Sequence, residues 1–273
     1  MMSNCTILVS SCDKYKDAWE PFFKLLKIFW KEIGDYSIVL STEKEEFCCN
    51  ELNISISHCL NSCSWSERLI HCLKEIKTKY VIFLLEDFFI QKQVDDKEIQ
   101  NCIHRMENDP QIACFYFKKV LNSWKESPYI GYHECTPELK YRLNAQAAVW
   151  RKDALLEFLD SKENPWEFEI IGSARIKNTA WKLFCRKDSD KYYNLDGPFP
   201  YLIGWENGLG ISRGKWLWNN KKLFRKHKIK VNYKNLGVAP KYIYGIGLYA
   251  KIRKILFPPL VWLRDKILKN KKK

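Results

Sequence analysis

The six residues Tyr80–Leu85 form an unbroken apolar run that stops abruptly at Glu86 and Asp87. An apolar run of this length is typical of a central parallel strand that is buried on both faces. Repeated strand–helix units around such a strand favour an α/β fold. We therefore expect the acidic pair at the carboxyl end of the strand, which is where ligands bind in open α/β sheets.

The rest of residues 1–220 alternates strand-like and helix-like segments. Further strands are predicted at residues 5–9, 36–40, 112–120 and 143–150 from their apolar, β-rich runs. Helices are predicted at residues 17–30, from Ser64 or Ser66 to about 77, at 97–108 and at 151–159, from apolar residues at helical spacing. This order predicts a single Rossmann-like α/β domain with a mixed, mostly parallel sheet that helices cover on both faces.

The positive charge of the chain is concentrated at its end. The 273 residues carry a formal net charge of +14, and residues 221–273 contain 17 Lys and Arg against one acid, Asp265. The tail therefore holds the whole excess. A nearly neutral body lacks the basic groove of a general nucleic-acid enzyme, so no nucleic-acid partner is expected for it. A nucleic-acid-binding protein that uses the basic tail stays the alternative from another class.

Residues 221–273 also mix large apolar residues with the basic ones. Leu260, Leu263 and Ile267 share one face of a predicted helix, Trp262 flanks it, and no stretch approaches the ~20 apolar residues that cross a bilayer. A basic amphipathic segment with Trp is typical of a helix in the headgroup region of an anionic membrane. The alternatives are a solvated tail and a helix packed on the body.

The eleven cysteines are irregularly spaced, and no secretory signal precedes the first strand. We therefore expect a cytoplasmic protein, peripheral on the inner face of the cell membrane, with reduced thiols that act as small buried hydrophobes. The sharper alternative is a zinc site formed by Cys59, Cys63, His71 and Cys72.

Two polar clusters follow predicted strands. Adjacent carboxylates such as Glu86 and Asp87 are costly to hold together unless water or a cation relieves them. A Mg²⁺ or Mn²⁺ ion shared with a diphosphate would do so, whereas the plain alternative is a solvated turn. The other cluster follows the first strand and provides candidate nucleotide ligands, namely Ser10, Ser11, Asp13 and Tyr15.

This order of segments resembles the glycosyltransferases of the GT-A fold over roughly residues 5–215, including uncharacterised bacterial transferases of capsule and lipopolysaccharide synthesis. Residues 81–89 look like the family's apolar strand with its acidic motif, with Glu86-Asp87 in place of the usual Asp-x-Asp. The resemblance implies a nucleotide-sugar donor, foremost a UDP-sugar, a glycan or lipid-linked acceptor, and a divalent cation. It also implies that Ser66 and Arg68 contact the nucleotide or diphosphate.

The segment after the predicted strand 143–150 combines aromatic rings with carboxylates. Gln146, Trp150 and Trp166 are candidates to contact the sugar or acceptor, with the Trp rings stacking on a pyranose face. Glu169 or Glu167 would be the general base of an inverting transfer, by resemblance to the family. If the two acids lie on a strand they share a face, and on a helix they diverge. The alternative is that the segment simply begins a helix, with acids in its first turn.

Basic residues near glycines could neutralise a leaving diphosphate. Arg213 and Lys215 follow a predicted turn at residues 207–210, and Arg175 follows Gly172. No Walker motif or dinucleotide-binding glycine fingerprint is present in the sequence. A catalytically silent, glycan-binding relative of the GT-A enzymes remains a further alternative.

Overall fold

The computed structural model describes residues 4–59, 63–187, 195, 197–202 and 210–239. Their main feature is a nine-stranded sheet in the order β3-β2-β1-β4-β8-β5-β9-β7-β6. The strands span β1 (Cys5–Ser10), β2 (Ser37–Thr42), β3 (Ile54–His58), β4 (Tyr80–Leu85), β5 (Ile112–Tyr116), β6 (Lys125–Glu126), β7 (Tyr132–Glu134), β8 (Ala148–Arg151) and β9 (Lys182–Arg186). Only β8 and β7 run against the direction of β1. The predicted mixed, mostly parallel α/β sheet is confirmed.

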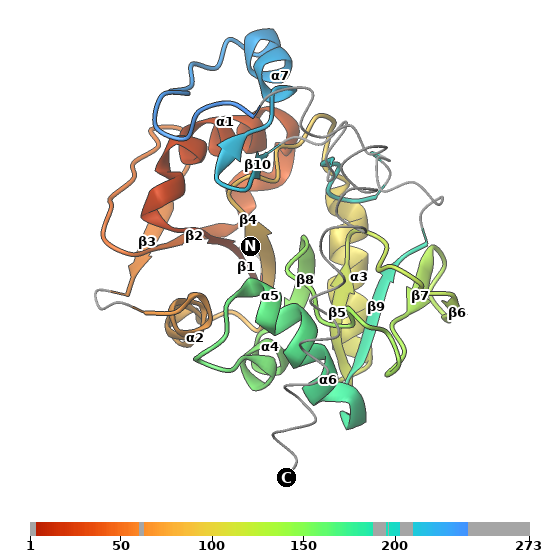
Figure 1. Ribbon diagram of the computed structural model, residues 1–273. Helices are drawn as coiled ribbons and strands as arrows, with labels where there is room; N and C mark the ends of the chain where they lie inside the picture. Colours follow the sequence, from red (N-terminus) through yellow and green to blue (C-terminus); the bar gives the residue numbers. More distant parts are fainter. Residues whose placement is uncertain (1–3, 60–62, 188–194, 196, 203–209, 240–273) are drawn as a thin grey trace, which may run out of the picture.

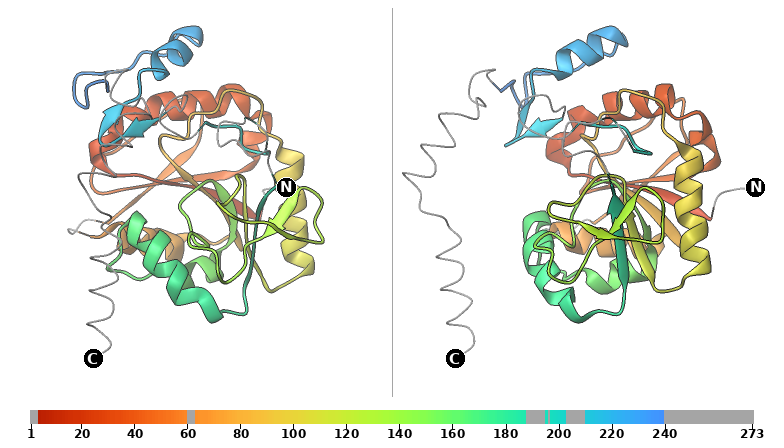
Figure 2. Two further views of the ribbon diagram at one scale, coloured as in Figure 1. Left: turned by 45° about the vertical axis from the view of Figure 1, so that its right-hand side comes forward. Right: turned by 90° about the vertical axis from the view of Figure 1, so that its right-hand side faces the viewer.

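Helices cover both faces of this sheet (Figures 1 and 2). On one face lie α1 (Trp19–Phe29) and α3 (Asp96–Asn108), whose buried side chains join one apolar cluster. On the other lie α2 (Trp65–Glu75) and α4 (Lys152–Phe158), in a second cluster. Successive residues of β4 alternate between the two clusters, because successive side chains of a strand point to opposite faces. The unbroken apolar run 80–85 is thus explained by burial on both sides.

Capping side chains begin two of these helices. The Ser64 hydroxyl accepts a hydrogen bond from the Glu67 N–H (3.0 Å), and the Asp95 carboxylate accepts one from the Glu98 N–H (3.1 Å). Each satisfies an N–H group that has no partner within the helix. The cap at Ser64 decides between the two predicted starts of α2.

Several boundaries differ from the sequence-based prediction. The strand expected over residues 143–150 begins only at Ala148, and the one expected over 112–120 ends at Tyr116. Strands β3, β6, β7 and β9 were not predicted. Residues 165–178, left unassigned by the sequence, are helical as α5 (Pro165–Glu167), the π-helix η3 (Phe168–Gly172), α6 (Ser173–Arg175) and η4 (Ile176–Asn178). The 3₁₀ helices η1 (Asp13–Ala18) and η2 (Lys31–Asp35) flank α1.

The packed unit continues past residue 220, the predicted end of the domain. A hairpin of β10 (Ile211–Ser212) and β11 (Lys215–Trp216) leads into α7 (Asn220–Lys226), whose Leu223 and Phe224 join the same cluster as α1. The Ala239 N–H donates to the Trp216 carbonyl (2.8 Å). Residues 221–239, the first part of the predicted tail 221–273, therefore pack on the body. The predicted amphipathic helix with Leu260, Leu263 and Ile267 lies outside the described residues. Within the described part of the chain, no helix is both long and apolar enough to span a membrane.

Candidate active site

The acidic pair lies directly after β4, as predicted. Strands β1 and β4 pair in parallel with Ser10 opposite Leu85, so Ser11 and Glu86 leave the sheet side by side. Glu86 is buried and Asp87 is half-buried. The carboxyl ends of two central strands thus meet at one polar point, the expected location of a ligand site in an open α/β sheet.

A segment distant in sequence fixes the Asp87 carboxylate. The Ile211 N–H, at the start of β10, donates to Asp87 Oδ2 (2.8 Å). The preceding Gly210 has φ +109°, and a Cβ there would lie 2.8 Å from both Asp87 O and Asp87 Oδ2. Only glycine fits such a conformation and so close an approach. Gly210 thus serves the site as well as the turn; residues 207–209 of that predicted turn lie outside the described residues.

The two carboxyl groups are held in a poorly solvated place. Burial, and next the charge of Asp87, raise the pKa of Glu86 well above its ordinary value, although the Ser11 hydroxyl and Arg68 act in the opposite direction. Burial raises the pKa of Asp87 to about 6, against the hydrogen bond from Ile211. Both shifts mean that the ionised forms are under-solvated, and the shift of Glu86 also reflects repulsion by the Asp87 charge.

The pair fits a hard divalent cation that brings its own further ligands. No group of three or more His, Cys, Asp or Glu residues in the described part of the chain is arranged to hold a metal. Mg²⁺ is commonly bound through one or two carboxylates together with substrate phosphates and water. Glu86 and Asp87 supply two oxygen donors of that kind, and a cation would relieve their mutual repulsion.

The hydroxyls at the end of β1 are positioned by two indole rings. The Ser10 hydroxyl accepts from Trp65 Nε1 (3.0 Å), and the Ser11 hydroxyl accepts from Trp19 Nε1 (2.7 Å). Burial raises the pKa of Tyr15, and the negative charges that add to this effect include Glu86 and Asp87. The structure therefore brings the predicted residues Ser10, Ser11 and Tyr15 to the acidic pair.

Asp13 and Arg68 act differently from the prediction, because protein groups already occupy both side chains. The Asp13 carboxylate accepts from the backbone N–H groups of residues 43–45 at 3.1–3.3 Å. In return, the Asp13 N–H donates to Glu43 Oε2 (2.9 Å), and Arg68 Nη1 donates to Glu43 Oε1 (3.1 Å). Glu43, which the sequence did not single out, thus joins the loop after β1 to α2. This network shapes the rim of the site.

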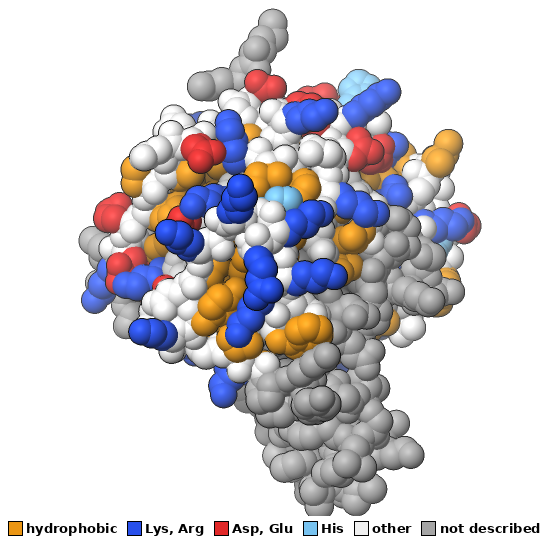
Figure 3. Space-filling model, turned by 90° about the horizontal axis from the view of Figure 1, so that it is seen from above, with side chains coloured by type: hydrophobic (Ala, Val, Ile, Leu, Met, Phe, Trp, Pro, Cys, Tyr) orange, Lys and Arg blue, Asp and Glu red, His pale blue; other side chains and the backbone are white. Residues whose placement is uncertain are grey.

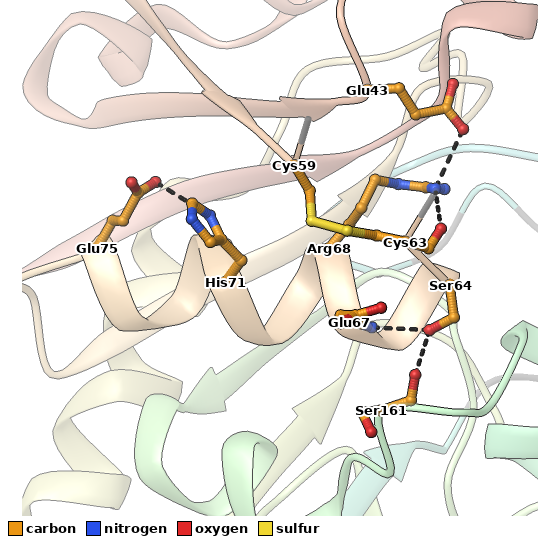
Figure 4. Close-up of a disulfide and its surroundings, with 9 residues drawn as sticks. All are labelled: Glu43, Cys59, Cys63, Ser64, Glu67, Arg68, His71, Glu75 and Ser161. Carbon is orange, nitrogen blue, oxygen red and sulfur yellow. Dashed lines mark hydrogen bonds and ion pairs between the residues drawn. A yellow bond between two sulfur atoms is a disulfide. The ribbon is translucent and has the colours of Figure 1, made fainter. Parts of the chain in front are cut away.

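The chain between β3 and α2 contains a disulfide, which corrects two expectations (Figure 4). Cys59 and Cys63 are bonded, with their Cα atoms 6.4 Å apart, so these thiols are not reduced. The zinc site is excluded as well, since His71 is exposed and directed to Glu75 while Cys72 is buried in the core. The disulfide lies next to the Ser64 cap, and the Cys63 carbonyl accepts from Arg68 Nη1 (3.0 Å).

The helix that begins at Pro165 separates the two candidate bases. Asn164 and Glu167 form a capping box, in which Glu167 Oε2 accepts from the Asn164 N–H (2.9 Å). Glu167 therefore caps the helix, as in the alternative that this segment simply begins a helix with acids in its first turn. Glu169 is half-buried, its Oε1 accepts from the Ala145 N–H (3.0 Å), and burial raises its pKa. Trp166 is 72% exposed and free of the core.

Contacts of Trp65 connect Glu169 to the acidic pair. The Trp65 ring packs against Phe168 (5.5 Å) and Phe83 (6.3 Å) while its indole N–H reaches Ser10. Glu169 is the next residue after Phe168 and touches the chain just before Gln146. The carboxylate of Glu169 and the acidic pair thus border the same end of the sheet.

Of the two further candidates for contact with the sugar or acceptor, Gln146 lies at the carboxyl end of β4 and Trp150 lies in the core. Gln146 precedes β8, whose Ala148 pairs with Phe83, so it lies level with the end of β4. Its Oε1, like the Ser66 hydroxyl, is buried and has no hydrogen-bond partner among the described residues. Trp150 is 1% exposed and packs against Phe158. The prediction that Trp150 stacks on sugar is wrong, because the apolar core encloses its ring.

The predicted basic residues lie in two different places. Arg213 and Lys215 lie at the tip and on the second strand of the β10–β11 hairpin, and a Cβ at Gly214 would be 3.4 Å from Lys14 Nζ. The hairpin tip thus lies beside the loop after β1. Arg175, by contrast, forms an ion pair with Glu163 and donates to a backbone carbonyl. Arg175 therefore connects α6 to the end of α4 and the segment that follows it.

Two residues at this end, Tyr201 and Lys118, were missed by the sequence analysis. Tyr201 stacks on Phe88 (4.4 Å between centroids), its hydroxyl accepts from the Ala147 N–H (3.2 Å), and Lys118 Nζ lies 5.4 Å from its ring. Lys118 is a buried cation just beyond the end of β5. The signal was present, since a Lys pair follows the buried run 112–117, but the strand was predicted to continue through it.

The chain is similar in structure to several nucleotide-diphospho-sugar transferases. It matches a structure of S. aureus TarS 1-349 with 15% identity and a TM-score of 0.44, covering 68% of this chain and 58% of that one. It matches the mannosyltransferase PcManGT from Pyrobaculum calidifontis, in complex with GDP-Man and Mn²⁺, with 9% identity and a TM-score of 0.46, covering 70% and 58%. A cytidylyltransferase from Leptospira borgpetersenii matches with 12% identity and a TM-score of 0.44, covering 70% and 80%.

This chain spans somewhat more than half of the TarS and mannosyltransferase chains. With TM-scores below 0.5 these matches carry no inference about substrate or reaction. No family model and no curated protein matches the chain.

Proposed function

We propose that the protein is a glycosyltransferase that binds a nucleotide-diphosphate sugar, foremost a UDP-sugar, at the carboxyl ends of β1 and β4. The observation that carries this proposal is the pair Glu86 and Asp87. Both carboxyl groups have raised pKa values, and a backbone N–H from β10 fixes Asp87. Glu86 and Asp87 would hold a Mg²⁺ or Mn²⁺ ion together with the diphosphate, and such an ion would supply positive charge to the leaving group.

Other residues at this end take supporting roles in the proposal. Ser10, Ser11 and Tyr15 border the nucleotide, and Gln146 offers a buried amide oxygen that a sugar hydroxyl can satisfy. Glu169 accepts the proton of the attacking acceptor hydroxyl, since its raised pKa suits a general base. Arg213 and Lys215 neutralise the departing diphosphate. We further propose a glycan or lipid-linked acceptor in surface polysaccharide synthesis, transfer with inversion, and exposed Trp166 as its stacking surface.

The first test is thermal denaturation with UDP-, GDP-, CMP- and dTDP-linked sugars, each with and without Mn²⁺ or Mg²⁺. One nucleotide at 100 times its Kd should stabilise the protein by about 2.7 kcal/mol. The part of this stabilisation that depends on the metal should disappear in Asp87→Asn. This substitution keeps the side-chain shape, and the new side chain can still accept a hydrogen bond from the Ile211 N–H. The matched control is Glu51→Gln, at an exposed carboxylate away from the sheet end.

The reaction is then tested by release of the nucleoside diphosphate from the donor that binds, with total lipid and glycan extracts as acceptors. Glu169→Gln should bind the donor and fail to transfer, whereas Glu167→Gln should only weaken the helix cap. Metal-linked binding without turnover would favour the silent glycan-binding relative. Absence of binding to every nucleotide sugar would refute the proposal.

A further inference from the structure

Residues 221–239 carry seven Lys and Arg and no Asp or Glu. All seven basic side chains are exposed. We call this set the basic face: Lys221, Lys222, Arg225, Lys226, Lys228, Lys230 and Lys234. Viewed from above, Lys and Arg side chains are spread over this side of the molecule, with apolar side chains between them (Figure 3).

The basic face is built on packed structure. Leu223 and Phe224 anchor α7 in the core, and His227 packs edge-on against Phe29 of α1 (5.1 Å). The Asn220 side chain bonds both the N–H and the carbonyl of Gly210 (2.9 and 2.7 Å). These contacts hold the backbone of α7 against the body, so the basic residues are carried on a packed segment.

The charge of this face is not neutralised by acids of the body. Elsewhere many lysines have partners, such as Lys16 with Glu45 and Lys182 with Asp109. Among the described residues, no carboxylate forms an ion pair with any of the seven basic residues from Lys221 to Lys234. A set of unpaired cations gathered on one packed segment attracts an extended anionic surface.

Apolar side chains at this surface indicate what kind of anion it meets. Trp218 is 36% exposed just before α7, and Ile28 is 42% exposed at the end of α1, the helix that His227 packs against. Trp is enriched at membrane–water interfaces, where its ring sits among lipid headgroups. Basic residues beside such a ring fit the negative headgroups of anionic lipids.

We propose that the basic face, together with Trp218, docks on an anionic lipid surface. This surface lies in the folded body and is distinct from residues 240–273. It is joined to the candidate active site by the β10–β11 hairpin, whose Ile211 N–H donates to Asp87. The proposal concerns binding alone and holds or fails independently of the proposed reaction.

The test is co-sedimentation of the full chain with vesicles of phosphatidylcholine alone or with phosphatidylglycerol added. The test variant carries Lys221→Gln, Lys222→Gln and Lys226→Gln. The matched control carries Lys74→Gln, Lys77→Gln and Lys162→Gln, which removes the same charge from exposed lysines elsewhere. We expect binding only to anionic vesicles, weakened roughly 100-fold in the test variant and far less in the control.

Trp218 provides a second readout that does not depend on charge. Brominated lipid should quench part of the tryptophan fluorescence, and Trp218→Phe should remove that part. Equal weakening in the two triple variants would overturn the proposal, because net charge or residues 240–273 would then account for binding. Equal binding to neutral vesicles would also overturn it. So would tighter binding to an oligonucleotide than to anionic vesicles at the same salt concentration, which would identify a nucleic-acid surface.

Discussion

Replacing Gly210 by alanine tests whether β10 shapes the acidic site. The residue has φ +109°, a region that residues with a side chain rarely adopt. Its new Cβ would lie 2.8 Å from the Asp87 carbonyl oxygen and from Oδ2, where ordinary contacts begin at 3.4 Å. One of these neighbours is the Asp87 backbone carbonyl, which also accepts from the Phe89 N–H (2.9 Å). Asp87 must therefore move and lose its 2.8 Å hydrogen bond from the Ile211 N–H.

The magnitude follows from these two costs. A residue held in a sparsely populated backbone region costs on the order of 1–3 kcal/mol, and overpacking typically adds a cost of about 1–3 kcal/mol. We expect Gly210→Ala to lower the free energy of unfolding by about 2–6 kcal/mol and to abolish the metal-dependent stabilisation by nucleotide.

Two other glycines provide matched controls. Gly237 has φ +65° with nothing within 4 Å of an added Cβ, so Gly237→Ala isolates the backbone cost, roughly 1 kcal/mol. Gly34 has neither a positive φ nor a near neighbour, so Gly34→Ala should be neutral or slightly stabilising. Urea denaturation and nucleotide titration measure both effects. The proposed role of Gly210 in holding Asp87 is refuted if Gly210→Ala has the stability of Gly237→Ala and still binds nucleotide with metal.

Three further predictions concern the core, the disulfide and pH. Trp150→Ala should lose about 3–5 kcal/mol of stability, whereas Trp166→Ala should leave the urea midpoint unchanged; equal losses would contradict the burial difference. Breaking Cys59–Cys63 with paired Cys→Ser changes should cost about 2 kcal/mol, because the closed loop is short, and Cys48→Ser, at an exposed free thiol, should cost nothing. Since the pKa of Asp87 is raised to about 6 and that of Glu86 is also raised, the folded state binds more protons than the unfolded state. Stability of the metal-free protein should therefore fall as the pH rises from about 4 through 6 and above, and Asp87→Asn should flatten that slope. Calorimetric metal–nucleotide affinity should change in the opposite direction, weakening below about pH 6.

The central strands could be predicted because their burial is recorded in local sequence. Strand β4 is apolar at every position, and its abrupt end at Glu86 marks the edge of the sheet. The caps at Ser64 and Asp95 are local as well, which is why α2 and α3 were placed within two residues of their observed ends. What is decided within about a dozen residues was accessible from the sequence.

Other features depend on contacts that no local pattern records. Strand β8 opposes its neighbours, and its short length follows from pairing with β4 and β5. The hydrogen bond from Ile211 to Asp87 joins positions 124 residues apart. Glu167 and Glu169 are a local exception, because they alternate as they would on a strand while the capping box of Asn164 and Glu167, which is also a local pattern, begins a helix there. The alternation alone could not decide between the two, and the assignment of the base depended on it.

Burial of the acidic pair lowers the stability of the fold. Glu86 and Asp87 occupy the end of a strand whose neighbours are almost all apolar, and both have pKa values raised mainly by burial. The Ser11 hydroxyl, Arg68 and the Ile211 N–H reduce that cost without removing it. For stability alone, uncharged residues of similar size would serve better at both positions. The fold instead commits a glycine at φ +109° and a separate strand to holding Asp87 in place. Such an arrangement is expected where the charge is used, and a cation shared with a diphosphate is the ligand whose binding would turn this unfavourable repulsion into affinity.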